Sequence, residues 1–80
     1  MKIEELRNLY AKRPFRPFII HLADGQEIPV DHPEFLAIAP GGDSVIVFRP
    51  GNGINYLAGR SFDIIDMALV TTLEMNAIPV

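Results

Sequence analysis

Two histidines and their acidic neighbours are the residues of this chain best suited to metal chemistry. His21 lies in a stretch of alternating apolar residues, and His32 follows Asp31 in a segment that also holds Glu34. Imidazoles and carboxylates are ordinary zinc ligands, so a site would need these side chains to converge. In the strand pairing predicted below, the histidines fall on opposite faces and far apart, at about 3.3 Å per residue. The sequence therefore predicts neither a metal site nor a cofactor.

Asp63 and Asp66 form a second candidate, because paired carboxylates can act as acid and base. No nucleophile or partner base accompanies them, and Asp66 is better placed to cap a turn. The chain has no cysteine, which excludes disulfides and thiolate chemistry. Gly51-Asn52-Gly53 lacks the lysine and the following helix of a phosphate-binding loop. We therefore predict that the protein is not an enzyme.

A basic segment near the N-terminus is a candidate for binding nucleic acid. Lys12, Arg13 and Arg16 lie among phenylalanines, and proteins that bind single strands mix charge and aromatic rings in this way. Residues 1–16 hold five basic and two acidic side chains, whereas residues 17–80 hold two basic and eight acidic. The body should repel a phosphate backbone, so RNA binding by an Sm-like module is our alternative prediction.

The clearest structural pattern is a β-hairpin over residues 17–30. Apolar residues alternate along 18–22, and Asp24-Gly25 is a strong turn signal. A two-residue loop would place a carboxylate and a proline opposite the apolar face. A three-residue loop, with Gly25 at positive φ, instead pairs Ile20 with Ile28 and keeps one consistent buried face. We predict this second register.

The other elements are read from spacing and from turn residues. Apolar side chains at three- and four-residue spacing predict an amphipathic helix over residues 1–13, which ends at a proline. Residues 14–17 then form a stiff connector, and residues 76–80 form a tail. Further strands are predicted at Phe35–Ala39, Ser44–Arg49 and Ala68–Met75. Phe62–Asp66 should lead through a tight turn into the last of these strands. The segment Ile54–Ser61 is either a strand or irregular.

This order of elements predicts one domain of the α+β class, a small, strongly bent, five-stranded antiparallel barrel over residues 18–75. A strand that ends in Leu22-Ala23-Asp24-Gly25 behind a helix resembles the opening of an Sm-like or Src-homology-3-like barrel. The chain also resembles a set of short, uncharacterised bacterial proteins that share PFRPFIIHLADG (14–25), HPEFLAI (32–38) and IID…LVTTLE (64–74). That second resemblance implies no activity and carries over no functional residues.

Hydrophobic residues make up 49% of the chain, more than one small core can bury. Val45–Phe48 is apolar on both faces, and the last strand has no proline or lysine to protect its edge. We therefore predict a module for protein interaction and self-association. A homodimer is the favoured assembly, a ring of the Sm-like kind is the alternative assembly, and an unknown protein is a further partner. The residues predicted to take part are Val45, Ile46, Val47, Phe48, Leu69 and Leu73.

The chain contains no apolar run of the length that a membrane span needs, about 18 residues. Its N-terminus is charged and amphipathic, and it lacks the apolar core of a signal peptide. We therefore expect a cytoplasmic protein that does not insert into a membrane.

Overall fold

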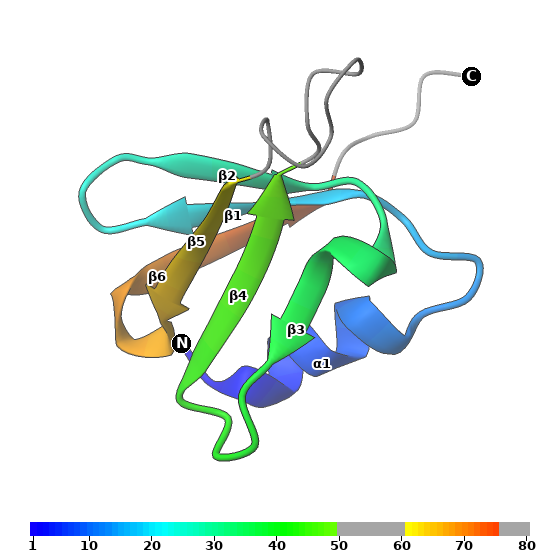
Figure 1. Ribbon diagram of the computed structural model, residues 1–80, viewed down its shortest axis with the longest axis horizontal. Coiled ribbons are helices and arrows are strands. Elements are labelled where there is room, and N and C mark those ends of the chain that lie inside the picture. Colours follow the sequence, from blue (N-terminus) through cyan, green and yellow to red (C-terminus); the bar gives the residue numbers. More distant parts are fainter. Residues whose placement is uncertain (50–60, 76–80) are drawn as a thin grey trace.

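The computed structural model describes residues 1–49 and 61–75, which form one α-helix, two 3₁₀ turns and six strands. In chain order the elements are α1 (Ile3–Ala11), β1 (Phe18–Leu22), β2 (Glu27–Val30), η1 (Pro33–Phe35), β3 (Leu36–Ile38), β4 (Ser44–Arg49), β5 (Ser61–Asp66), η2 (Met67–Leu69) and β6 (Val70–Met75). The strands make two antiparallel sheets, β2-β1-β6 and β3-β4-β5. Figure 1 shows β3-β4-β5 in front of the other sheet, with α1 below both.

The predicted five-stranded barrel is wrong, although the α+β class is right. Within the described ranges there are six strands, and no pairing joins an edge of one sheet to an edge of the other. A 3₁₀ turn that begins at Pro33 separates β2 from β3, and a second, capped by Asp66, separates β5 from β6. At each turn the chain passes from one sheet to the other, so the ladder of hydrogen bonds stops there. Most of Ile54–Ser61 and the predicted tail, 76–80, lie outside the described residues.

The N-terminal helix packs on the sheets, as its apolar stripe predicts. Its first turn holds Glu4 and Glu5, whose charge suits the positive end of the helix dipole. Leu6 is fully buried, and Ile3 and Leu9 pack against the core beside it. A helix of this length is marginal in isolation, so this packing is what stabilises it.

The hairpin has the predicted register. Ile20 lies opposite Ile28, and Phe18 lies opposite Val30, so their side chains share the buried face. Gly25 closes the turn with a φ of 92°. The three-residue loop is therefore confirmed, together with the need for a residue that tolerates positive φ.

The core lies between the two sheets and is closed by α1. Its largest fully buried side chains are Phe18, Leu6, Ile20, Val30, Val45 and Val47. Val45 and Val47 point inward from β4, the middle strand of its sheet. The prediction of a central strand is correct. Among the described residues of β4, however, only those on its inner face are fully buried, and its outer face is partly exposed.

Gly25 offers a direct test of the hairpin turn. A Cβ at this position would meet no atom within 4 Å, so any penalty must come from the backbone conformation. We expect Gly25→Ala to lower the free energy of unfolding by about 1–2 kcal/mol, because L-residues avoid positive φ. Urea melts measure this change. Gly41→Ala is the control, since a Cβ there makes only an ordinary 3.4 Å contact with Asp43. Equal effects of the two changes would contradict the turn.

Candidate functional site

The two histidines contact different residues, and within the described ranges they do not share a partner. Nε2 of His21, on β1, lies 2.7 Å from Oε1 of Glu74 on β6. His32 comes just before η1, and its ring meets that of Phe35 edge-on at a centroid distance of 5.4 Å. In the part of the chain that the structure describes, no three His, Cys, Asp or Glu side chains come close enough to hold a metal ion.

The two aspartates of β5 also have distinct structural partners. Asp63 accepts two hydrogen bonds from the guanidinium of Arg49, with N–O distances of 2.8 and 3.0 Å. Asp66 accepts a hydrogen bond from the backbone N–H of Ala68 at 2.9 Å and caps η2, which is the role predicted for it. One carboxylate thus joins two strands, and the other shapes a turn.

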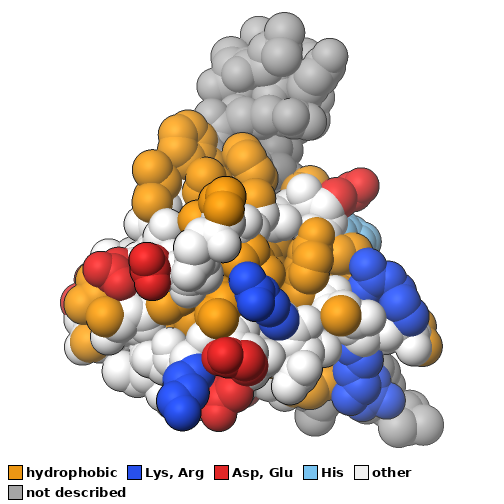
Figure 2. Space-filling model, turned by 90° about the horizontal axis from the view of Figure 1, so that it is seen from below, with side chains coloured by type: hydrophobic (Ala, Val, Ile, Leu, Met, Phe, Trp, Pro, Cys, Tyr) orange, Lys and Arg blue, Asp and Glu red, His pale blue; other side chains and the backbone are white. Residues whose placement is uncertain are grey.

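The basic segment lies at the end of α1. Lys12, Arg13 and Arg16 are all exposed. The guanidinium of Arg13 turns back and donates to the carbonyl oxygens of Tyr10 and Lys12, each at 2.9 Å. Figure 2, which looks at the molecule from below, shows basic and acidic side chains interspersed on this side. This arrangement gives RNA binding less support than a surface of uniform positive charge would give.

The six residues predicted for self-association fall into separate places. Val45 and Val47 belong to the core and cannot reach a partner. Ile46 and Phe48, which alternate with them on β4, lie on the outer side of the sheet. The remaining two are apart from these: Leu69 is exposed on η2, and Leu73 is half-buried on β6.

An apolar surface covers the outer side of β4 and β5, and we call it the β4–β5 face: Ile46, Phe48, Phe62 and Ile64. Ile46 lies opposite Ile64, and Phe48 lies opposite Phe62, with ring centroids 6.1 Å apart. Phe48, Phe62 and Ile64 are 41%, 57% and 69% exposed. Figure 2 shows hydrophobic side chains gathered at its upper border, the side on which this sheet lies. Four apolar side chains in cross-strand pairs form a surface that can bind another apolar surface.

The sequence predictions missed Phe62 and Ile64 because these residues lie on the outer face of β5, whereas the alternation of apolar and polar residues predicts that they are buried. Phe62-Asp63-Ile64 alternates in a way that normally places the apolar residues inside. In the structure the register pairs Val45 with Ile65, so Phe62 and Ile64 point out. Asp63 shares the inner side with Ile65, at the end of the sheet where Arg49 binds it. The alternation was visible in the sequence, but its direction depends on the neighbouring strand.

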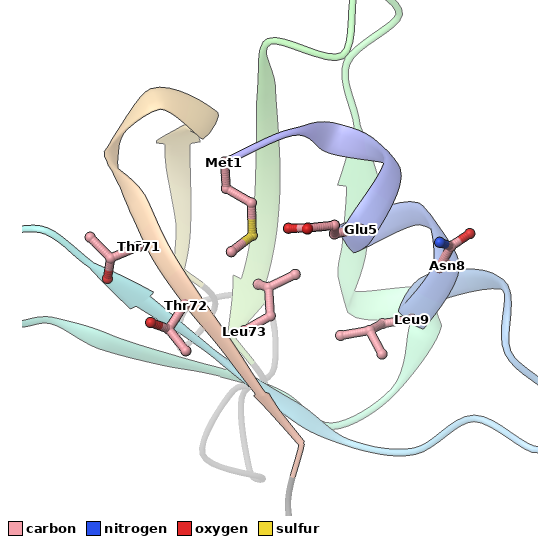
Figure 3. Close-up of a pocket in the computed structure, with 7 residues that line it drawn as sticks. All are labelled: Met1, Glu5, Asn8, Leu9, Thr71, Thr72 and Leu73. Atoms are coloured by element: carbon pink, nitrogen blue, oxygen red, sulfur yellow. The ribbon is translucent and has the colours of Figure 1, made fainter.

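A second surface feature is a groove between α1 and β6, which Figure 3 shows in close-up. It has a volume of about 380 Å³. Its lining residues are Met1, Glu5, Asn8, Leu9, Thr71, Thr72 and Leu73. The groove therefore combines apolar side chains with one carboxylate, one amide and two hydroxyl groups, and we call it the α1–β6 groove.

The helix α1 has nine residues. No helix within the described ranges is long and apolar enough to span a membrane. In comparisons with models of protein families, with curated proteins and with solved structures, none matches this chain.

Proposed function

We propose that the protein is a non-enzymatic interaction module and that its β4–β5 face binds a second copy of the same chain. The observation that carries the proposal is the orientation of β5. Its apolar residues Phe62 and Ile64 face out, while the charged Asp63 is on the inner side, where it pairs with Arg49. Exposing apolar residues in this way is unfavourable for a lone chain, and association removes the penalty.

A second copy is the occupant that fits this face best. The four side chains are apolar throughout, so the face is complementary to itself without any need to match charges. Two such sheets can stack across a two-fold axis, with the side chains of both packed between them. The tilted rings of Phe48 and Phe62 would supply the centre of the contact, since buried aromatic residues dominate interface energies.

The size and charge of the chain indicate a weak dimer. A stable interface buries at least about 1,000 Å² in total, and each aromatic ring contributes about 150–250 Å² when it is fully covered. The four side chains therefore supply the core of such an interface and need the neighbouring sheet surface to complete it. Each chain also carries a net charge of −3, which opposes close approach at low salt.

The prediction concerns the mass of the protein in solution. Wild-type protein should approach the mass of a dimer as its concentration rises through the micromolar range, and Ile64→Asp should stay monomeric because it places a charge in the apolar contact. Sedimentation equilibrium or light scattering measures both. Leu69→Asp is the matched control, since Leu69 is also exposed but lies on η2, away from the β4–β5 face.

The controls make the outcome decisive. A monomeric wild type at all concentrations would overturn self-association. If Leu69→Asp disrupted the dimer and Ile64→Asp left it intact, the dimer contact would lie at η2 instead. Leu69 was also among the residues predicted from the sequence to take part in self-association. Retention of RNA that falls steeply with salt would favour the basic segment of Lys12, Arg13 and Arg16 as the functional surface.

A further inference from the structure

We propose that the α1–β6 groove binds an extended segment of a different protein, which adds a strand to the sheet beside β6. This inference concerns a separate surface on the other sheet and does not depend on the dimer. It follows from where the groove lies on β6, from which backbone groups β6 presents there, and from the charge of the groove.

The groove follows the outer edge of β6. Thr71, Thr72 and Leu73 are consecutive residues, and all three line it. Neighbouring side chains on a strand point to opposite faces, so a hollow that touches all three must run along an edge of the strand. The other edge of β6 is paired with β1. The groove therefore lies on the edge that no described strand occupies, with α1 as its second wall (Figure 3).

The hydrogen bonds of β1 establish which way its backbone groups point. The N–H of Leu22 donates to the carbonyl oxygen of Gln26 at 2.9 Å, so Leu22 bonds toward the β2 side of the hairpin. Bonding direction alternates along an antiparallel strand, so His21 and Ile19 bond toward β6. Pro29, which has no N–H, lies opposite Ile19, at a position where β2 needs no donor.

The same alternation applies to β6. His21 pairs with Thr72 and Ile19 pairs with Glu74, so these two residues of β6 direct their N–H and C=O groups to β1. Leu73 lies between them and directs its N–H and C=O to the outer edge. Among the described residues, the N-terminal ammonium of Met1 donates to the carbonyl oxygen of Val70 at the start of this edge, at 3.5 Å, and no backbone group pairs with Leu73. A free donor and acceptor at the groove are what an added strand needs.

The side chains that line the groove indicate which side chains the added strand should have. Figure 3 shows Leu73 and Leu9 pointing into the space between β6 and α1, which suits an apolar side chain of the ligand. Glu5 has the one charged side chain among the residues that line the groove. Met1 also lines it, and its N-terminal ammonium donates to the carbonyl oxygens of Met67 and Val70 at 3.1 and 3.5 Å. A lysine or arginine near the apolar residue would pair with Glu5.

The charge also argues for a different protein as the occupant. A second copy would bring its own Glu5 and Glu74 to the same edge. Like charges across a close contact are unfavourable. A basic, extended peptide meets no such repulsion.

Amide exchange tests the orientation of β6 first. In the free protein we expect the amide proton of Leu73 to exchange faster than those of Thr72 and Glu74, which are bonded to β1. The Ile64→Asp variant should be used, so that self-association cannot protect any amide. Slow exchange at Leu73 in this monomer would overturn the proposal, because the edge would then already be occupied.

Peptide selection tests the ligand. A library of short random peptides is selected against immobilised Ile64→Asp protein, and each recovered peptide is then measured in solution. We expect peptides with alternating apolar residues and at least one lysine or arginine, and we expect them to slow exchange at Leu73. Failure to recover any peptide, or recovery only of peptides that leave Leu73 exchanging fast, would overturn the proposal.

Two matched comparisons separate strand addition from general attraction. Glu5→Lys should weaken binding at least about tenfold, whereas Glu4→Lys, on the same turn of α1 but outside the groove, should have little effect. N-methylation of alternate peptide residues should abolish binding in one phase and spare it in the other, since only one set of N–H groups faces β6. Equal effects of the two lysine variants, or of the two methylation phases, would contradict the groove as a strand-binding site.

Discussion

Replacing Ile65 with aspartate should leave no folded protein at room temperature, whereas the same change at Ile64 should leave the fold intact. Ile65 is 3% exposed and Ile64 is 69% exposed, although they are neighbours on β5. A carboxylate in the core has no partner there, and its burial costs several kcal/mol, close to the total stability of about 5–15 kcal/mol for a small protein. At the surface the carboxylate stays hydrated. Circular dichroism and urea melts of both variants measure the difference.

The pair is its own control, because the two changes are chemically identical and lie one residue apart. If Ile64→Asp also unfolded the protein, then the β4–β5 face would be covered by the chain itself, and the proposed dimer contact would lose its basis. If Ile65→Asp folded normally, then the register between β4 and β5 would be wrong.

Leu6→Ala should lower the free energy of unfolding by about 3 kcal/mol, the usual effect of truncating a fully buried leucine. Leu6 is 0% exposed, and it is the one residue of α1 that is fully enclosed by the core. Leu9→Ala should have a smaller effect, because Leu9 is only partly buried at the rim of the groove. Urea melts monitored by circular dichroism measure both changes. A neutral Leu6→Ala would mean that α1 does not pack on the sheets in solution.

The hairpin could be predicted from the sequence because all the information that fixes it is local. The turn at Asp24-Gly25 and the alternation on each side of it lie within a few residues, and only one register gives a buried face. The amphipathic helix and the cap at Asp66 are local in the same sense. Such features depend on local propensity and on residue spacing, and both can be read directly from the sequence.

The strand count and the composition of the β4–β5 face depend on distant partners. Phe62–Asp66 alone would place Phe62 and Ile64 inside, and only the pairing of Val45 with Ile65 reverses this. Half of the face, Ile46 and Phe48, was predicted from the two-sided apolar pattern of β4. The α1–β6 groove could not be predicted, because it joins residues from the two ends of the chain.

The position of β1 between β2 and β6 has a consequence for how the protein is made. Its pairing with β2 closes a loop of a few residues, but its pairing with β6 joins positions far apart, as between Thr71 and the carbonyl of His21, 50 residues away. During synthesis the hairpin can form early, while the second edge of β1 stays open until the last strand emerges. Nascent or truncated chains that end before β6 would therefore expose an unpaired edge beside apolar side chains, which is a template for aggregation.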